Sequence, residues 1–178
     1  MMELELAALG RSVLVLGGTR SGKSKIAESL IEGTGGGIYL ATAELLDDEM
    51  QDRVSAHKAR RGNNWQTVEE PLAIAAVIED LTSTGNEAPL LIDCLTLWLS
   101  NLIHHKLNII IETQKLTEAI DAAPYTTILV SNEVGQGIVP DNALARQFRD
   151  AAGLLHQSIA AHADSVIFVV AGIPQRIK

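Results

Sequence analysis

Short runs of apolar residues alternate along the chain with longer stretches in which apolar side chains recur every three or four positions. The short runs predict buried strands, and the recurring pattern predicts amphipathic helices. The predicted strands are Ser12–Gly17, Ile38–Ala43, Trp65–Glu69, Pro89–Cys94, Thr126–Ser131 and Ser165–Ala171. The predicted helices are Lys23–Glu32, Asp47–Arg61, Leu72–Leu81 with Pro71 at the first helical position, further segments up to Ala123, and Ala143–Ala163. The triplet Ile109–Ile111 fits a strand as well as a helix.

The alternation of strands and helices predicts βαβ crossovers and a mostly parallel sheet with helices on both faces. No internal repeat, low-complexity tract or linker divides the chain, so its 178 residues are expected to form a single α/β domain, residues 1–178. The first eleven residues carry no chemistry that we identify, and we expect residues 1–11 to be a flexible lead-in.

Composition restricts the class of protein further. Hydrophobic residues make up 47% of the chain and aromatic residues only 3%, so the core must be aliphatic, as in α/β packing. The formal net charge of −8 argues against a general nucleic-acid-binding surface, so any anionic ligand must be held by a local group of cations. The N-terminus is unlike a signal peptide, and no run of about 18 apolar residues predicts a membrane span. The single cysteine, Cys94, excludes an internal disulfide and fits a reducing cytosol.

The segment GGTRSGKS, residues 17–24, matches the G-x-x-x-x-G-K-[ST] pattern of phosphate-binding loops and lies between a predicted strand and a predicted helix. Its residues are Gly17, Gly18, Thr19, Arg20, Ser21, Gly22, Lys23 and Ser24. Backbone N–H groups of such a loop surround the phosphates, and the helix adds its positive N-terminal end. Lys23 is expected to reach the β- and γ-phosphates, and the Ser24 hydroxyl is expected to bind Mg²⁺. The motif predicts a nucleoside triphosphate but leaves open the base and the acceptor.

Asp93 ends the predicted strand Pro89–Cys94, at the edge where parallel α/β sheets bind ligands. A carboxylate there supports Mg²⁺ in many phosphate-loop enzymes; alternatively, Asp93 or Thr96 simply caps the helix that follows. Asn132 and Glu133 lie at the same edge, either as substrate or metal contacts or as turn and capping residues.

His57 lies on the predicted helix Asp47–Arg61, in one stripe with Met50 and Val54, and three cations follow it within four positions. In one interpretation the helix has an acidic start and a basic end that suit its dipole, and His57 is a structural residue. In the other, the cations bind phosphates and a neutral His57 attacks a phosphorus atom. The local pattern permits both. No metal site is assigned to the remaining histidines. His104 and His105 are adjacent and point apart on a helix, and His156 and His162, six positions apart, fall on different helix faces.

Several motifs together resemble one family, in order from Ser12 to Lys178. They are GGTRSGKS, YLATAELLDDEM, HKARR followed by W..VEE, LLIDCLTLWLSNL, SNEVGQGIVP, and ARQFRDAAGLLHQSIA…VVAGIPQRIK. The chain resembles the bifunctional adenosylcobinamide kinase/adenosylcobinamide-phosphate guanylyltransferases of cobalamin biosynthesis. Many proteins share the phosphate loop, whereas ATAELLDDEM…HK combined with NEVGQGIVP is far more specific.

The resemblance implies two reactions. A kinase step moves the γ-phosphoryl group of ATP or GTP to the aminopropanol hydroxyl of adenosylcobinamide. A second step moves GMP from GTP to that phosphate through a guanylylated histidine, giving adenosyl-GDP-cobinamide and pyrophosphate. The resemblance also implies a three-layer, RecA-like P-loop fold and a homotrimer. The phosphate loop and the single cysteine add the expectation of Mg²⁺ and of a cytoplasmic enzyme. The alternatives are a single-activity P-loop kinase without covalent GMP, and a non-catalytic nucleotide-dependent binding module, which the absence of an N-K-x-D motif disfavours.

The resemblance also implies roles for individual residues. His57 and Lys23 would be catalytic, and Ser24 and Asp93 would bind the metal. The implied nucleotide contacts are Gly17–Ser24, Ala41, Thr42, Ala43, Lys58, Ala59, Arg60, Arg61, Glu69 and Asp93. The chain departs from some members at three positions: Ala56 replaces a second histidine, Asp93 replaces a glutamate, and His156 replaces a frequent asparagine.

Overall fold

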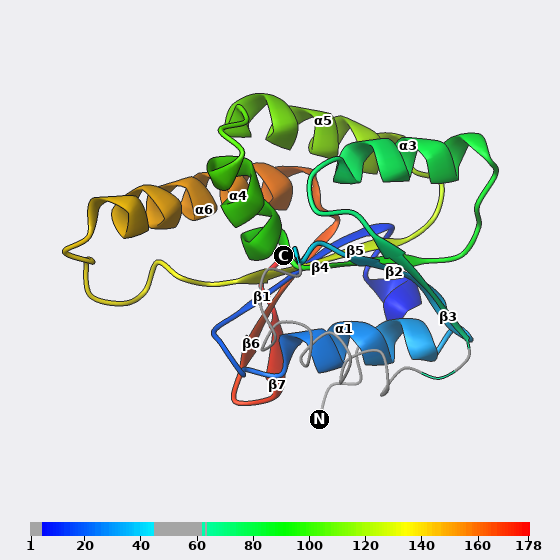
Figure 1. Ribbon diagram of the computed structural model, residues 1–178. Helices are drawn as coiled ribbons and strands as arrows, with labels where there is room; N and C mark the ends of the chain where they lie inside the picture. Colours follow the sequence, from blue (N-terminus) through cyan, green and yellow to red (C-terminus); the bar gives the residue numbers. More distant parts are fainter. Residues whose placement is uncertain (1–4, 45–61, 63) are drawn as a thin grey trace.

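A computed structural model of the chain describes residues 5–44, 62 and 64–178. Its centre is a seven-stranded sheet in the order β3-β2-β4-β5-β1-β6-β7 (Figure 1). The strands are β1 (Ser12–Gly17), β2 (Gly37–Ala41), β3 (Trp65–Glu69), β4 (Leu90–Asp93), β5 (Thr127–Asn132), β6 (Ser165–Val170) and β7 (Ile173–Arg176). All neighbouring strands are parallel except β6 and β7, which are antiparallel. The prediction of a mostly parallel sheet is confirmed.

Helices cover both faces of the sheet and form three layers (Figure 1). Among the described helices, α1 lies on one face, and α3, α4, α5 and α6 lie on the opposite face. The helices are α1 (Lys23–Glu32), α3 (Ile74–Ser83), α4 (Leu95–His104), α5 (Ile109–Ala122) and α6 (Ala143–His162). The predicted helix Asp47–Arg61 lies outside the described residues. In the part of the chain that is described, no helix is both long and apolar enough to span a bilayer.

The core consists of two clusters, one on each face of the sheet. In β1, Val13 and Val15 pack into the cluster on the α1 side, while Leu14 and Leu16 pack into the cluster on the other side. Every residue of β1 is buried. Because successive side chains of a strand point to opposite faces, a strand covered on both sides is apolar throughout. This is why the central strands were predictable as uninterrupted apolar runs.

Two local predictions differ from the structure. Pro71 is not the first residue of a helix, since α3 begins at Ile74. The Glu70 carboxylate accepts hydrogen bonds from the backbone N–H groups of Leu72 (2.9 Å) and Ala73 (2.8 Å), which hold this segment in a turn. The ambiguous triplet beginning at Ile109 is helical and forms the first turn of α5. The Asn108 side chain caps that turn by accepting from two of its N–H groups.

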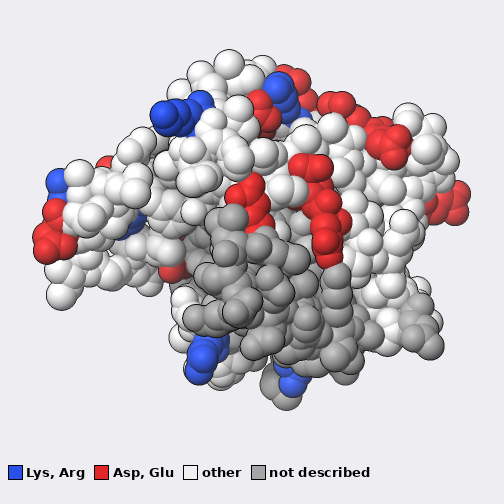
Figure 2. Space-filling view, in the orientation of Figure 1, with Lys and Arg blue, Asp and Glu red and all other residues white. Residues whose placement is uncertain are grey.

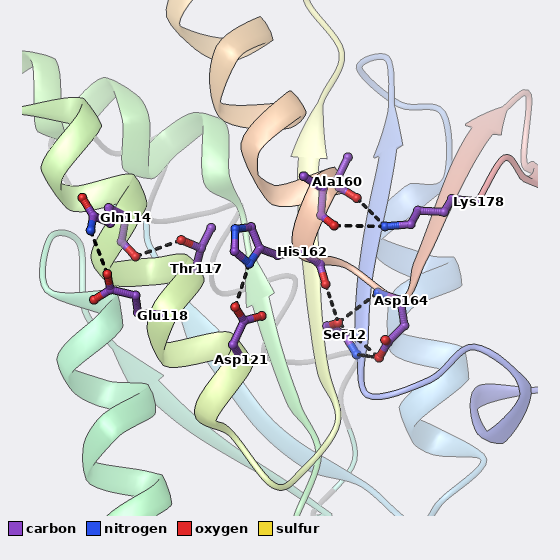
Figure 3. Close-up of polar contacts among 10 residues, drawn as sticks. Ser12, Gln114, Thr117, Glu118, Asp121, Ala160, His162, Asp164 and Lys178 are labelled. Carbon is purple, nitrogen blue, oxygen red and sulfur yellow. Dashed lines mark hydrogen bonds and ion pairs between the residues drawn. The ribbon is translucent and has the colours of Figure 1, made fainter.

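The amino edge of the sheet is closed by a polar contact between distant segments (Figure 3). Asp164 Oδ2 accepts hydrogen bonds from the backbone N–H groups of Arg11 (2.7 Å) and Ser12 (3.0 Å). The bond from Ser12 is the main reason why the pKa of Asp164 is lowered. Just before this contact, Leu9 is buried and follows a short 3₁₀ helix, Leu6–Ala8. Part of the segment expected to be a flexible lead-in therefore packs against the sheet.

Charge is distributed without a single basic patch on the face drawn in Figure 2. Outside the grey atoms, lysine and arginine side chains appear at separate places, and acidic side chains spread across the upper part of the view. This arrangement agrees with the formal charge of −8 and offers no phosphate-backbone track on the described part of that face.

Candidate active site

The loop of residues 17–24 leaves β1 and turns sharply into α1. Gly22, the N-cap of α1, has a positive φ of 97°, and Arg20 has a φ of 58°. Ser21 donates its N–H to the Gly18 carbonyl (3.1 Å) and accepts from the N–H of Gly172 (2.8 Å), which ties the loop to the β6–β7 turn. The first N–H groups of a helix have no partner within the helix. The turn therefore presents donors and the positive helix end at one place, as a phosphate site requires.

Position 17 requires a glycine because other atoms of the protein lie too close to its Cα for a side chain to fit. A Cβ atom at this position would lie 2.5 Å from Ser21 Oγ and 2.6 Å from the carbonyl oxygen of Val169. At Gly18, by contrast, a Cβ atom would meet nothing within 4 Å. The first glycine of the loop therefore serves packing, which the motif alone does not distinguish from phosphate contact.

Gly17→Ala is expected to lower the free energy of unfolding by about 1–3 kcal/mol, because overpacking a tight site costs that much. Chemical denaturation without nucleotide measures this loss. Gly18→Ala is the matched control, and its free energy of unfolding should stay within about 0.5 kcal/mol of wild type. Equal losses in the two variants would show that the close approach at Gly17 is not the cause.

Lys23 begins α1, and its side chain folds back over the loop. The side chain is buried, and its ammonium group donates to the Gly18 carbonyl at 3.3 Å. Burial lowers the pKa of Lys23, and nearby Cys94 and Asp93 partly oppose this shift. The cation is thus held at the loop in a partly desolvated setting, where its attraction for phosphate oxygens is stronger than in water.

Asp93 ends β4 at the same edge of the sheet. Its carboxylate Oδ2 accepts a hydrogen bond from the Tyr39 hydroxyl at 3.0 Å. The N-cap of the following helix α4 is Cys94, and the side chain of this residue makes no capping hydrogen bond. The Thr96 hydroxyl does not cap the helix but accepts a hydrogen bond from Asn132 Nδ2 at 2.8 Å. The capping interpretation is therefore wrong for both Asp93 and Thr96.

The strand register brings several predicted residues into one row. Glu69 of β3 and Asp93 of β4 both pair with Ala41 of β2, and Gly17 of β1 pairs with Asn132 of β5. Glu69 is exposed, while Ala41 is buried. The carboxyl ends of these strands therefore place both carboxylates at the edge that carries the phosphate loop.

Thr42 ties the ends of β2 and β4 together. It is fully buried, and its hydroxyl donates to the Cys94 carbonyl (2.8 Å) and accepts from the Cys94 N–H (2.9 Å). Its own carbonyl accepts from Asn101 Nδ2 at 2.8 Å, and its N–H donates to the carbonyl of Asp93 at 3.3 Å. The polar groups of Thr42 are thus engaged inside the protein. Of the predicted contacts 41–43, Ala43 is the one that is half-exposed.

Glu133 follows β5 and is fixed to the loop strand through its backbone. Its N–H donates to the Gly17 carbonyl at 3.0 Å, and its carboxylate accepts from the Gly135 N–H. The Asn132 side chain donates a hydrogen bond to the hydroxyl of Thr96, in the first turn of α4. These contacts favour the turn-forming interpretation for Glu133.

A buried pair of Ser131 and His156 was missed from the sequence. Ser131 Oγ and His156 Nε2 are 2.7 Å apart, and both residues are buried behind the strand end that carries Asn132. Burial lowers the pKa of His156, and the charge of Glu133 partly opposes this shift. A usable signal existed, since His156 shares an apolar stripe of α6 with Ala152 and Ile159.

The His156 pair predicts a pH-dependent stability. The unfolded chain titrates His156 near its ordinary pKa of 6.5, whereas the folded-state pKa is lower. As the pH falls below 6.5, the unfolded chain binds a proton that the folded protein does not, so the free energy of unfolding falls. His156→Asn should remove this part of the slope, and denaturation at several pH values measures it. His104→Asn, at an exposed position, should retain the slope; parallel profiles for wild type and His156→Asn would contradict the prediction.

Five further predicted site residues lie outside the described residues: His57, Lys58, Ala59, Arg60 and Arg61. The described chain ends on one side of this segment at Glu44, whose carboxylate lies 2.8 Å from Nε2 of His105. The contact joins the end of β2 to the turn after α4.

The fold and the loop define a class. A phosphate loop at the carboxyl edge of a mostly parallel three-layer sheet, with a buried lysine and a carboxylate nearby, is that of a P-loop nucleotide-binding protein. Two solved structures share this fold: an ATPase of a bacterial type III secretion system (TM-score 0.56, 13% identity, 90% of this chain and 51% of that chain), and a Pyrococcus horikoshii protein studied as PH0250 (TM-score 0.56, 8% identity, 98% of this chain and 92% of that chain). These likenesses support the predicted fold class.

Sequence comparison is more specific. The chain belongs to the cobinamide kinase / cobinamide phosphate guanyltransferase family, whose sequence profile matches residues 13–177. It is 46% identical over 168 residues to the bifunctional adenosylcobalamin biosynthesis protein CobP of Pseudomonas aeruginosa, covering 93% of this chain and 96% of that protein. It is 40% identical over 181 residues to the corresponding protein CobU of Escherichia coli, covering 93% and 99%. The predicted family is confirmed, and the chain is a transferase.

Proposed function

We propose that this chain phosphorylates the aminopropanol hydroxyl of adenosylcobinamide, using ATP or GTP, and then transfers GMP from GTP to that phosphate. The observation that carries the proposal is the phosphate loop with Lys23 buried over it, in a chain that matches a bifunctional family over residues 13–177. Its products are adenosyl-GDP-cobinamide and pyrophosphate.

In the kinase step, the hydroxyl oxygen of adenosylcobinamide attacks the γ-phosphorus atom. A new O–P bond forms, the bond to the β,γ-bridging oxygen breaks, and the nucleoside diphosphate leaves. The hydroxyl proton passes to solvent or to a neighbouring base. Backbone N–H groups of residues 17–24 and the Lys23 ammonium stabilise the charge that accumulates on the β- and γ-phosphate oxygens.

In the guanylyltransferase step, a neutral nitrogen of His57 attacks the α-phosphorus of GTP, and pyrophosphate leaves. A phosphate oxygen of adenosylcobinamide phosphate then attacks the same phosphorus, and the P–N bond to His57 breaks. The proposed nucleotide contacts for this step are Ala41, Thr42, Ala43, Lys58, Ala59, Arg60, Arg61, Glu69 and Asp93. The half-exposed Ala43 and the exposed Glu69 at the carboxyl edge support part of this set.

Ser24 and Asp93 are the residues that we expect to hold Mg²⁺. Both offer oxygen donors, which Mg²⁺ prefers, and Asp93 acts electrostatically on Lys23 beside Ser24. Among the described residues, no group of three or more His, Cys, Asp or Glu side chains is placed to hold a metal alone. This fits a cation that takes its other ligands from water and nucleotide phosphates. When bound, Mg²⁺ neutralises phosphate charge.

We further propose that the protein is a homotrimer of single-domain chains in the cytoplasm; the homotrimer is what the family resemblance implies. Cys94 is a free, buried cysteine, and burial and the charge of Asp93 raise its thiol pKa to about 11, so the thiol is protonated at neutral pH. Exposed apolar side chains such as Ile138 (97% exposed) and Ile110 (79%) are available for contacts between copies. Sedimentation equilibrium measures the oligomeric state.

The test uses GTP labelled at either the α- or the γ-phosphate, with Mg²⁺. The α-label should bind covalently to the chain through an acid-labile, base-stable linkage, and adenosylcobinamide phosphate should release it as adenosyl-GDP-cobinamide. The γ-label should pass to adenosylcobinamide and not to the chain. Transfer of the γ-label without capture of the α-label would indicate a kinase only. Nucleotide binding without either transfer would indicate a binding module.

A further inference from the structure

The hydrogen bond between Tyr39 and Asp93 crosses from β2 to β4 beside the phosphate loop. The strand register pairs Tyr39 with Leu91 and Ala41 with Asp93, so the phenol reaches one step diagonally across the sheet. Tyr39 and Leu91 belong to the same core cluster as α1. Side chains two residues apart share a face of a strand, so Asp93 also faces α1 and the start of its phosphate loop.

The Tyr39 ring is held in place by its surroundings. The residue is 5% exposed, and its ring packs edge-to-face against Trp65 of β3, with centroids 6.3 Å apart and an interplanar angle of 77°. Such aromatic pairs have a preferred geometry, and a buried tyrosine hydroxyl normally has a fixed partner. The hydroxyl donates to Asp93 Oδ2 at 3.0 Å and therefore fixes the rotation of the carboxylate.

The second carboxylate oxygen remains available. Within residues 5–44, 62 and 64–178, no donor reaches Asp93 Oδ1, and the Lys23 ammonium donates to the Gly18 carbonyl instead of to Asp93. The carboxylate is half-buried and oriented by a neutral donor, and Lys23 acts on it by charge without a hydrogen bond to it. A carboxylate held in this way has one fixed oxygen, Oδ2, and one oxygen, Oδ1, that can bind a cation.

We propose that Tyr39 is a positioning residue for the metal of this enzyme. Its phenol holds Asp93 Oδ2, so that Oδ1 is presented to the Mg²⁺ that accompanies the bound nucleotide. The inference rests on the proposed function in assigning Asp93 to the metal, and goes beyond it by assigning the residue that orients that carboxylate. Partners that hydrogen-bond a ligating carboxylate commonly tune metal affinity without touching the metal.

Tyr39→Phe removes only the hydroxyl and keeps the ring against Trp65. Mn²⁺ serves as the probe, and paramagnetic resonance measures free Mn²⁺ in the presence of a non-hydrolysable GTP analogue. The affinity for Mn²⁺ should fall by about 10-fold, as for other partners of metal-ligating groups. Affinity for the analogue in chelator, without any divalent metal, should stay unchanged, which a general loss of structure would not allow.

Tyr125→Phe is the matched control. Tyr125 is the other tyrosine of the chain; it is also buried, and its hydroxyl donates to the Ile78 carbonyl at 3.0 Å, within the core on the opposite face. Its substitution removes a comparable buried hydrogen bond and should leave the Mn²⁺ affinity at the wild-type value. Thermal melting of both variants compares their stabilities.

A third variant separates this inference from the proposed function. Asp93→Asn should weaken Mn²⁺ binding more than Tyr39→Phe does. If Asp93→Asn lowers the affinity and Tyr39→Phe leaves it at the wild-type value, the positioning role is wrong and the metal role of Asp93 stands. If Asp93→Asn leaves the affinity unchanged, the metal assignment of Asp93 fails, and the role of Tyr39 fails with it. Equal losses in Tyr39→Phe and Tyr125→Phe would also overturn the inference.

Discussion

His57→Ala is expected to abolish covalent capture of GMP and to lower guanylyl transfer by about 10⁴- to 10⁶-fold, the range seen when a nucleophile or its partner is removed. The methyl group of alanine cannot attack phosphorus, and the direct reaction must then do without the two easier steps that a covalent intermediate provides. In the proposed mechanism the kinase step depends on the phosphate loop and not on His57, so its rate should stay close to wild type. Protein-bound α-label and γ-phosphoryl transfer to adenosylcobinamide measure the two activities separately.

The control for this variant is His104→Ala, at the exposed last residue of α4. It should label as strongly as wild type. Labelling of His57→Ala at the wild-type level would show that another residue is the nucleophile. A parallel loss of kinase activity would show instead that His57 serves the fold or the nucleotide site in general, which is the structural interpretation that its helical pattern left open.

The central fold could be predicted from the sequence because its strands are buried on both faces. β1 is buried at every position, so an uninterrupted apolar run marks it, and the phosphate-loop motif then fixes where α1 begins. β7 could not be predicted in this way. It has only four residues, three of them exposed, and pairs antiparallel with β6 through the turn at Ala171 and Gly172. A short edge strand carries neither an apolar run nor a clear alternation.

The contacts that shape the candidate site depend on strand order, which an apolar pattern does not specify. Tyr39 and Asp93 are 54 positions apart and meet only because β2 and β4 are neighbours. Because β2 and β4 are neighbours, the Thr42 hydroxyl also forms two hydrogen bonds with the backbone of Cys94. A residue predicted to contact the nucleotide therefore has a hydroxyl that is hydrogen-bonded inside the protein. His156 is buried behind β5 for the same kind of reason. The motifs identified Asp93 and Thr42 as site residues, but only the strand order shows that Tyr39 and Cys94 are their partners.

Lys23→Met is expected to lower the rates of both transfers by about 10²- to 10³-fold, as removal of one charge-stabilising donor does in other enzymes. Methionine keeps most of the buried stem and removes only the ammonium group, which lies at the loop with a hydrogen bond to Gly18. The rates of both steps should fall, because the kinase step builds charge on the β- and γ-phosphates and the guanylyl step releases these phosphates as pyrophosphate. Single-turnover kinetics with each labelled GTP measures the two rates.

Lys25→Met is the matched control, since Lys25 lies two positions further along α1 and is exposed. Its rates should match those of wild type. A second readout is the pH profile of kcat/KM for the kinase step. Because burial lowers the pKa of Lys23 from its ordinary value of 10.5, the free enzyme loses this charge at a lower pH than an exposed lysine would. Activity should therefore fall on an alkaline limb below pH 10.5 in wild type and in Lys25→Met. Lys23→Met should lack that limb, and its persistence there would assign the titration to a different group.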